Sequence, residues 1–459
     1  MENEIREYAE VIRRAKNSRD ELFGRLSSPG KERLWLTASL KDIKKVVVIA
    51  GASRSGSSLL FSILKNLPGV YSLSGENVPF YKLNGLYGDS FISDGDFSDG
   101  EADISGLERD FLSGFSFSLK KENPVGECPQ DYIDSLLPRF ILQWPEVNFS
   151  PAIFNKFAVR AYRSCFKERG GFIAENFYLE FLALLREEYP GINPYYYDII
   201  PARVKARFPD LPLPQGPANR SLMIEEAPFV LLSPGRPPAK EELSENILLL
   251  KSSVDCYRLD FLERLFPEAR VRIIYLTRNP FGSINGLYDG WLHRGFFSHN
   301  LSRILKEENT PLEISGYSDL YEWGKWWWNY DLPPGWRSYT RKRLEEVCAF
   351  QWRSANEAVC RHLEEREKSC CRVKYEKIVG DFEPRREEIN RIIDFMGLSP
   401  DAAGRLNLKN LPAVQATENP ALYRWREREA MLKPLLGDKD LAALGERLGY
   451  HRGNIEEWI

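Results

Sequence analysis

Residues 51–58, Gly-Ala-Ser-Arg-Ser-Gly-Ser-Ser, have the residue types and spacing of an anion-binding loop. Its two glycines permit a tight turn, and the hydroxyls of Ser57 and Ser58 follow the second glycine. The loop stands between a β-branched run at 46–49 and an apolar helical pattern that ends near Pro68. A strand, a glycine-bearing loop and a helix in this order direct backbone N–H groups and the positive end of the helix dipole at one point. The chemistry predicted here is the binding of a phosphate-like anion.

The cation of this loop is Arg54 instead of a lysine. The spacing matches the phosphate loop of magnesium-dependent nucleotide hydrolases, but Ser57 stands where their lysine would be. A later strand that would have to end in a metal-binding aspartate ends in Thr277-Arg278. Both departures argue against a P-loop kinase or NTPase. Two arginines on separate loops favour a nucleotide that carries anionic groups at two places.

Four motifs resemble those of the sulfotransferases that use 3′-phosphoadenosine 5′-phosphosulfate (PAPS). In chain order they are Arg54-Ser-Gly-Ser-Ser58; Leu276-Thr-Arg278-Asn-Pro280; Val373-Lys-Tyr375-Glu376 with Asp394-Phe-Met-Gly-Leu398; and Trp425-Arg426 with Arg447-Leu-Gly-Tyr450. The likeness extends over roughly 44–78 and 246–450. It implies a bacterial-type, P-loop-like sulfotransferase with a large insertion, PAPS as co-substrate, and no metal ion.

The resemblance also implies roles for the residues that bind the 5′-phosphosulfate. Arg54, Ser55, Gly56, Ser57 and Ser58 would cradle this group, with backbone N–H groups and hydroxyls as donors. Lys251, at the end of a predicted strand, stands where the family has a lysine near the sulfuryl group.

Other motif residues are expected at the 3′-phosphate and the adenine. Arg278 would bind the 3′-phosphate, since its fork suits bidentate contacts. The serine that the family places eight residues later is Gly286 here, so Ser283 or Asn285 is expected to replace it. Three candidates remain, each with two interpretations. Tyr375 either contacts the adenine or packs in the core. Arg424 and Arg426 either close over the 3′-phosphate or belong to a solvated face.

The catalytic base is not at the place that the cytosolic branch of the family uses. That branch has a histidine after its Lys-Thr/Ser, whereas Lys251 is followed by two serines, which cannot act alone as bases at neutral pH. Glu76 resembles the Gly-Glu carboxylate of the tyrosylprotein branch, although this chain has two extra residues before it. Desolvation near an acceptor hydroxyl would raise its pKa. A solvated loop glutamate is the alternative, and His293 is the second candidate base.

A parallel sheet is needed to bring these residues together. Predicted strands at Ile247–Lys251 and Arg272–Thr277, with a helix between them, form a right-handed crossover. The expected fold is α/β, a three-layer P-loop-like fold with a central parallel sheet flanked by helices. We expect an N-terminal helical extension at 1–40, a core at 41–78 and 246–459, and a mostly helical inserted subdomain at 79–245 that shapes the acceptor site.

Three further segments have open interpretations. Residues 1–26 predict an amphipathic helix for packing or oligomerisation, and the glycine- and aspartate-rich residues 85–110 predict a mobile surface loop. The aromatic-rich segment 317–339 either lines the acceptor pocket or belongs to the core.

Composition limits the class of protein. A net charge of −3 over 459 residues gives no reason to expect nucleic acid as a partner. The sequence lacks the run of about 18 apolar residues that a membrane span needs. Its charged N-terminus and its seven cysteines without a Cys-x-x-Cys pair favour the cytoplasm, and its four scattered histidines disfavour a histidine-rich metal site.

The sequence therefore predicts a sulfotransferase that moves the sulfuryl group of PAPS in line to a hydroxyl or amine. The acceptor is a small molecule, a carbohydrate or a lipid. A catalytically inactive nucleotide-binding interaction protein is the first alternative, and a P-loop kinase is the second. The oligomeric state stays open.

Overall fold

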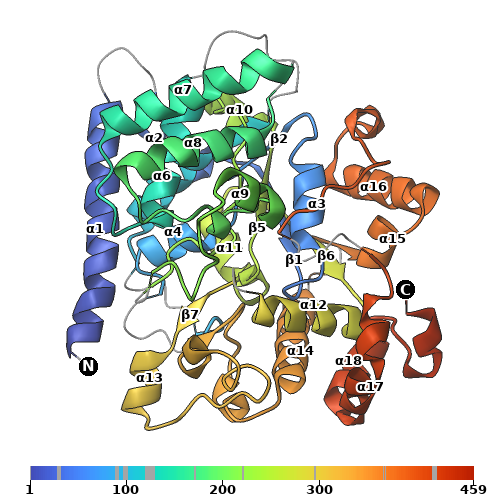
Figure 1. Ribbon diagram of the computed structural model, residues 1–459. Coiled ribbons are helices and arrows are strands. Elements are labelled where there is room, and N and C mark those ends of the chain that lie inside the picture. Colours follow the sequence, from blue (N-terminus) through green and yellow to red (C-terminus); the bar gives the residue numbers. More distant parts are fainter. Residues whose placement is uncertain are drawn as a thin grey trace.

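The computed structural model describes residues 2–27, 33–87, 93–96, 102–118, 130–169, 172–219, 222–293, 296–364, 366, 369–415 and 421–458 (Figure 1). No helix in these ranges is long and apolar enough to cross a bilayer. Much of the predicted loop at 85–110 lies outside the described residues, namely 88–92 and 97–101.

A seven-stranded sheet forms the centre of the fold, in the order β4-β3-β2-β5-β1-β6-β9. A separate pair is formed by β7 and β8. The strands are β1 (Lys45–Ala50), β2 (Val70–Ser72), β3 (Ser116–Ser118), β4 (Gly235–Arg236), β5 (Ile247–Lys251), β6 (Arg270–Thr277), β7 (His299–Asn300), β8 (Trp327–Trp328) and β9 (Cys370–Lys374).

The strands from β2 to β9 in this order are parallel. β3 pairs antiparallel with both β2 and β4, so β3 alone of these seven strands runs in the opposite direction. In register, Val46 of β1 lies between Leu248 of β5 and Val271 of β6. The α/β class and the mostly parallel central sheet are thereby confirmed. Both β3 and β4 belong to the segment 79–245, so this segment extends the sheet as well as adding helices.

Helices cover both faces of the sheet. The longer helices, of six or more residues, are α1 (Glu2–Leu26), α3 (Ser57–Leu64), α4 (Val78–Leu83), α5 (Ile104–Gly114), α6 (Gln130–Gln143), α7 (Pro151–Arg169), α8 (Ala174–Glu188), α9 (Pro201–Arg207), α10 (Lys240–Glu245), α11 (Leu259–Leu265), α12 (Pro280–Leu292), α13 (Ser302–Glu307), α14 (Leu344–Leu363), α16 (Phe382–Met396) and α18 (Lys439–Arg447). Shorter ones are α2 (Leu34–Thr37), α15 (Tyr375–Val379) and α17 (Glu429–Leu432).

The alternation of side chains along β1 divides the core into two layers. Val47 and Ile49 point into one cluster, which packs against α3, α15 and α16. Val46 and Val48 point into a larger cluster on the opposite face, which packs against α11, α12 and α14 (Figure 1). A strand that is buried on both faces needs a continuous apolar run, which is why 46–49 could be recognised from sequence.

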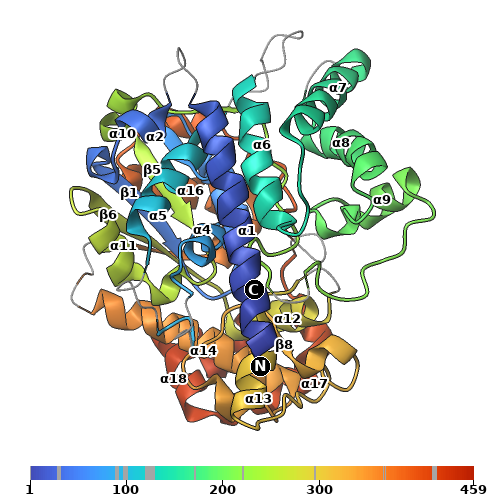
Figure 2. The same ribbon diagram turned by 90° about the vertical axis from the view of Figure 1, so that its left-hand side faces the viewer.

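The larger cluster continues into the N-terminal helix and the segment 79–245. Val11 and Ala15 of α1 belong to it, together with Phe140 of α6 and Phe181 of α8. Figure 2 shows α1 lying along α6, with α7, α8 and α9 grouped at one side of the molecule. Helix α1 therefore packs within the chain itself.

Part of the predicted loop at 85–110 is ordered. Asp103 accepts a hydrogen bond from the backbone N–H of Gly106 at 2.8 Å and so caps α5, whose Leu107 and Phe111 are fully buried. Asp94 is also fully buried and accepts from Arg258 at 2.9 Å. For these residues the prediction of a surface loop was wrong, because the capping and the buried ion pair outweigh the polar composition.

Candidate functional site

Five parallel strands each deliver one chemically important residue to the same edge of the sheet. In spatial order, Glu76 follows β2, Lys251 ends β5, Arg54 follows β1, Arg278 follows β6 and Tyr375 follows β9. All five line one cavity of about 1,230 Å³, a volume that includes its open mouth. Ligands of α/β sheets bind at the carboxyl ends of the strands, and this cavity has that position. Its size suits a ligand as large as a nucleotide.

Steric constraints shape the anion-binding loop between β1 and α3. Gly56 has φ +95°, and a Cβ there would lie 2.3 Å from the ring of Tyr375. Arg54 also has a positive φ of 65°. The Tyr375 ring thus packs directly on the loop, and only glycine fits beneath it. Among the hydroxyl residues expected to bind the anion, Ser57 and Ser58 line the cavity, at the first turn of α3, where backbone N–H groups lack helical acceptors.

Arg54 and Arg278 are coupled through the loop backbone. Nη1 of Arg278 donates to the carbonyl oxygen of Arg54 at 3.0 Å, and its guanidinium lies 4.4 Å from the centre of the Tyr375 ring. Its Nε is buried and has no hydrogen-bond partner among the described residues. Burial lowers the pKa of Arg278, and the positive charges of Arg54 and Arg424 act in the same direction, against the opposing effects of Tyr375 and Glu376. An anion bound here would relieve this repulsion.

The charges of the cavity separate it into two ends. Lys251, Arg139 and Arg424 are each paired with a carboxylate, at Glu76, Glu225 and Asp289 respectively. Arg54 and Arg278 are the lining cations with no carboxylate partner within the described ranges. The uncompensated positive charge therefore lies at the β1 and β6 strand ends, where the sequence predicted the nucleotide.

Glu76 and Lys251 form a short ion pair in the same cavity. Nζ of Lys251 also donates to Oγ of Ser58 at 3.0 Å, so it links Glu76 to the anion-binding loop. Oε2 of Glu76 accepts from the Ser252 hydroxyl at 3.3 Å and from the Ser253 N–H at 3.4 Å. Burial favours the neutral acid, but the charge and hydrogen bonds of Lys251 outweigh it, so the pKa of Glu76 is lowered. The predicted rise in pKa does not hold while Lys251 is its partner.

Gln415 lies over the anion-binding loop and takes up its donors. Its backbone oxygen accepts from Nη1 of Arg54 at 2.6 Å, and its side-chain oxygen accepts from Oγ of Ser58 at 2.8 Å. Its own N–H donates to Asp198 at 2.9 Å. Two oxygens of Gln415 thus occupy donors that the sequence assigned to an anion.

Several predicted site residues lie outside the cavity lining. The hydroxyl of Ser55 is directed at the carbonyl of Ala52, and Ser283 is fully buried. Arg426 stacks on Tyr423 and donates to the Glu456 carbonyl at 3.1 Å, whereas Arg424 lines the cavity.

Asn285 and Gly286 show what replaces the usual serine. Oδ1 of Asn285 accepts from Arg428 at 2.6 Å, and a Cβ on Gly286 would lie 3.3 Å from Cβ of Arg54. The Gly286 carbonyl accepts from Nε of Arg54 at 3.2 Å. This position therefore contributes close backbone packing beside Arg54 and no hydroxyl.

His293 lies at the rim of the site. It is the residue after α12, and the Phe296 ring lies 5.3 Å from its own ring and 5.2 Å from the Arg54 guanidinium. Partial burial, and then the charge of Arg54, lower the pKa of His293. The imidazole is therefore neutral at pH 7, but Phe296 belongs to the cavity lining and His293 does not.

The segment 79–245 supplies site residues that the sequence analysis missed. Arg139, Glu225 and Glu226 line the cavity. An arginine within the apolar stretch of α6, and two glutamates within a proline-rich stretch, were the available signals. From the aromatic-rich segment 317–339, Tyr330 lines the cavity, while Trp327, Trp328 and Trp336 are core residues.

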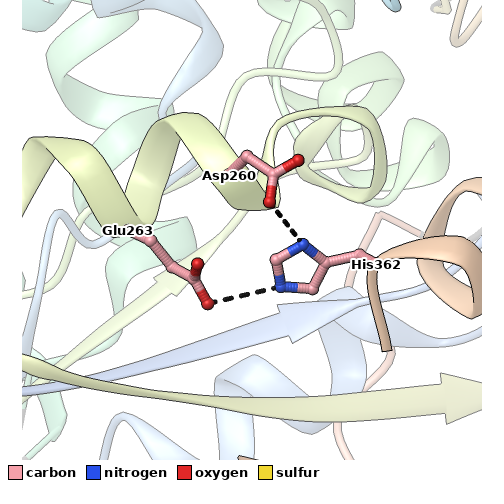
Figure 3. A group of neighbouring side chains, drawn as sticks. All are labelled: Asp260, Glu263 and His362. Carbon is pink, nitrogen blue, oxygen red and sulfur yellow. Dashed lines mark hydrogen bonds and ion pairs between the residues drawn. The ribbon is translucent and has the colours of Figure 1, made fainter. Parts of the chain in front are cut away.

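A group of side chains with metal-ligand types lies elsewhere. Asp260 and Glu263 of α11 flank His362 of α14, at 2.9 and 3.4 Å from its two ring nitrogens (Figure 3). Arg366 lies 3.6 Å from Asp260 and 3.4 Å from Glu263. Because each nitrogen faces a different carboxylate and Arg366 offsets their charge, the geometry is that of an ion-pair cluster between two helices.

No protein-family model matches this chain, and no curated protein matches it. Similar solved structures include the sulfotransferase domain of the Synechococcus PCC 7002 olefin synthase, with 15% identity, a TM-score of 0.33, and 92% of this chain and 99% of that chain covered. A sulfotransferase domain from the curacin biosynthetic pathway has 12% identity, a TM-score of 0.31, and coverages of 85% and 98%. Sulfotransferase STF9 from Mycobacterium avium has 11% identity, a TM-score of 0.34, and coverages of 86% and 76%.

Proposed function

We propose that this protein is a PAPS-dependent sulfotransferase that acts on a hydroxyl or amine of a small-molecule, carbohydrate or lipid acceptor. The observation that carries the proposal is the charge pattern of the cavity. Arg54 and Arg278, on adjacent strand ends, have no carboxylate partner in the described part of the chain, while Lys251 and Glu76 lie beside them. These two guanidiniums, whose charge no carboxylate of the described residues offsets, suit a nucleotide with two anionic groups, and a lysine–carboxylate pair suits transfer to a protic acceptor.

The donor would be held by the chain's own cations. Arg54, the hydroxyls of Ser57 and Ser58, and the N–H groups at the start of α3 would bind the 5′-phosphosulfate. Nε of Arg278 is a buried donor available for the 3′-phosphate. PAPS supplies an activated sulfuryl group on a phosphate leaving group. Fixed donors of this kind stabilise charge on a leaving oxygen, each by about 3 kcal/mol of barrier.

Lys251 and Glu76 would have separate roles: Lys251 would contact the bridging oxygen of the donor, and Glu76 would take the proton of the acceptor. Lys251 already contacts Ser58 in the loop, so a small movement takes its ammonium from Glu76 to the bridging oxygen of the donor. Glu76 would then keep its burial and lose its cation, which raises its pKa toward that of an effective base. The acceptor hydroxyl would lose its proton to Glu76 as its oxygen attacks sulfur. The products are a sulfate ester and adenosine 3′,5′-bisphosphate.

Ligand-induced thermal stabilisation tests the donor site. Adenosine 3′,5′-bisphosphate is expected to raise the melting temperature of the full chain without magnesium, and ATP is expected to do so much less. Stabilisation by ATP that requires magnesium would favour a P-loop kinase. Absence of any shift with the bisphosphate would refute the donor assignment.

Consumption of PAPS with a panel of hydroxyl and amine acceptors tests the transfer itself. Release of adenosine 3′,5′-bisphosphate that depends on the acceptor is the expected result. Binding of the bisphosphate without any consumption of PAPS would point instead to an inactive nucleotide-binding interaction protein.

A further inference from the structure

Arg139 of α6 and Glu225 form a buried ion pair in the cavity lining. Nη2 of Arg139 donates to Oε1 of Glu225 at 2.9 Å, and the two side chains are 8% and 5% exposed. Nε and Nη1 of Arg139 and Oε2 of Glu225 are buried and have no hydrogen-bond partner within the described residues. Buried charged groups with unused donors and acceptors are costly. The pair therefore has the composition of a binding site for a further polar group.

This pair lies next to the proposed base. A Cβ on Gly75, the residue before Glu76, would lie 2.5 Å from Nη2 of Arg139. Burial raises the pKa of Glu225, the charge of Arg139 and an interaction with the Gln143 side chain oppose this, and the negative charge of Glu76 adds to the rise. The unused atoms of the Arg139–Glu225 pair are thus placed where an acceptor would present a second group while its reacting group contacts Glu76.

Charge balance at this end of the cavity selects a neutral ligand. Each carboxylate of the lining has one cation partner: Glu76 pairs with Lys251, Glu225 with Arg139, and Glu226 with Lys82 at 2.8 Å. A carboxylate or an ammonium brought in by the acceptor would be buried without a counter-charge, which is unfavourable. The uncompensated cations Arg54 and Arg278 lie at the nucleotide end.

The chemistry of the unused atoms selects the group itself. Arg139 can only donate and the Glu225 carboxylate can only accept. A hydroxyl is a neutral group that does both through a single oxygen atom, because it accepts from the guanidinium and donates to the carboxylate at once. A carbonyl would leave Glu225 unsatisfied, and an ammonium would leave Arg139 unsatisfied.

We propose that the acceptor is a neutral polyhydroxylated molecule of the sugar or polyol class, one hydroxyl of which binds between Arg139 and Glu225 while another contacts Glu76. This inference rests on the proposed function for the reacting hydroxyl. Binding of the polyol is measurable separately from transfer. A free sugar and a sugar on an apolar chain share this chemistry.

Calorimetry on the full chain saturated with adenosine 3′,5′-bisphosphate tests the class. Methyl β-glucoside and myo-inositol are the neutral probes, with octyl β-glucoside for a sugar on an apolar chain. Glucuronate, glucosamine and phenol are the anionic, cationic and single-hydroxyl comparisons. At least one neutral polyol is expected to bind 10-fold or more tightly than all three comparisons. Binding of no neutral probe, or tighter binding of a comparison probe, would overturn the proposal.

Two variants test the residues. Arg139→Met removes the donors, and Gly75→Ala keeps both charges but places a methyl group where the guanidinium lies. Each variant is expected to lower the affinity for the neutral polyol 10-fold or more, while the affinity for the bisphosphate changes less than two-fold. Asp134→Asn is the matched control, because Asp134 is on the same helix, pairs with Arg33 at 2.8 Å and is outside this lining. Unchanged polyol affinity in a folded Gly75→Ala protein would refute the assignment.

A failure of the proposed function gives a different pattern. The polyol titrations are therefore repeated without nucleotide. A protein that binds polyols through Arg139 but shows no binding of the bisphosphate retains this inference and loses the sulfotransferase assignment. A protein that binds the bisphosphate but no polyol loses this inference and retains the nucleotide site of the proposed function.

Discussion

At the scale of single residues, the ionisation of Glu76 depends on the partner of Lys251. The carboxylate is held charged by the lysine, by two hydroxyl or N–H donors and against its own burial. The contacts that keep Glu76 ionised also occupy the carboxylate oxygens that would accept a proton. Its use as a base therefore requires Lys251 to move toward the anion-binding loop, which it already touches at Ser58.

Glu76→Gln is expected to lower kcat by about 100- to 10,000-fold, because an amide cannot accept the proton. The affinity for adenosine 3′,5′-bisphosphate should change less than about two-fold, since the strand order places Glu76 across β5 from Arg54 and Arg278. Steady-state kinetics and calorimetry measure the two quantities. His293→Gln is the control, and a larger loss in that variant would make His293 the base.

The pH profile of kcat/KM distinguishes the same two candidates. Since the pKa of Glu76 lies below its ordinary value of 4.5, the free enzyme keeps this base ionised at all higher pH values. We expect an acid limb below pH 4.5. An acid limb above pH 4.5 but below pH 6.5 would instead match a histidine whose pKa is lowered from 6.5.

The two unpaired arginines should dominate nucleotide affinity. Arg54→Ala removes charged hydrogen bonds worth about 2 kcal/mol, which corresponds to a roughly 30-fold lower affinity for adenosine 3′,5′-bisphosphate. Arg426→Ala is the matched control, because its guanidinium stacks on Tyr423 outside the lining. Calorimetric titration compares them. Equal losses in both variants would mean that the effect of Arg54 is a general change in charge.

At the scale of elements, the site is assembled where the anion-binding loop meets the start of α15. The ring of Tyr375 packs on Gly56, and the Arg278 guanidinium lies 4.4 Å from the centre of the same ring. The position of β9 in the sheet therefore fixes the shape of a loop that is more than 300 residues earlier in the chain.

Gly56→Ala should displace Tyr375 and weaken adenosine 3′,5′-bisphosphate at least about 10-fold, because the new methyl group would overlap the ring. Gly335→Ala separates this clash from backbone strain. Gly335 also has a positive φ, of 84°, but nothing lies within 4 Å of a Cβ there. It should cost about 1 kcal/mol of stability and leave affinity unchanged. Retained affinity in Gly56→Ala would show that Tyr375 does not define the loop.

Elements with a strong local signal could be predicted from sequence. The buried runs of β1, β5 and β6 occur where their patterns predicted. The strands β3 and β4 could not be predicted, because they have three and two residues and are defined by pairing between Phe117 and Arg236. Helix α5 was hidden by polar composition, although Asp103 was a capping signal.

The site was predictable only where it followed the strands. Arg54, Lys251 and Arg278 each come directly at or after a strand end, so topology alone brings them together. Arg139 and Glu225 face the same cavity from distant segments. Their position at the cavity depends on the tertiary packing of α6, and no local sequence pattern indicates that packing.

At the scale of the whole molecule, buried carboxylates couple stability to pH. Burial, reinforced by the charge of Asp94, raises the pKa of Asp331 to about 7. Burial likewise raises the pKa of Asp255 to about 7, against the opposing charge of Arg258. Between pH 4 and 7 the folded chain binds these protons and the unfolded chain does not. Their contribution to stability is therefore complete below the unfolded pKa and is lost as pH rises through about 7.

Asp331→Asn should flatten this dependence, because asparagine stays neutral. The free energy of unfolding of the natural chain is expected to fall from pH 5 to pH 8, and in the variant to fall by about 2–3 kcal/mol less. Denaturant unfolding at several pH values measures this. An identical slope in the variant would show that Asp331 is ionised in the folded state throughout. The hydroxyls of Ser53 and Tyr257, which lie 3.0 and 2.9 Å from the Asp331 carboxylate oxygens, can hydrogen-bond to the amide of asparagine as well.

The contacts of Gln415 have a consequence for rates. A nucleotide cannot engage Arg54 and Ser58 until the two oxygens of Gln415 have left them. Binding should then proceed in two steps, and the observed association rate should reach a plateau as nucleotide concentration rises, in place of a linear increase. The height of that plateau is the opening rate of this short stretch of chain. In turnover the same stretch would also govern how long the spent nucleotide stays bound.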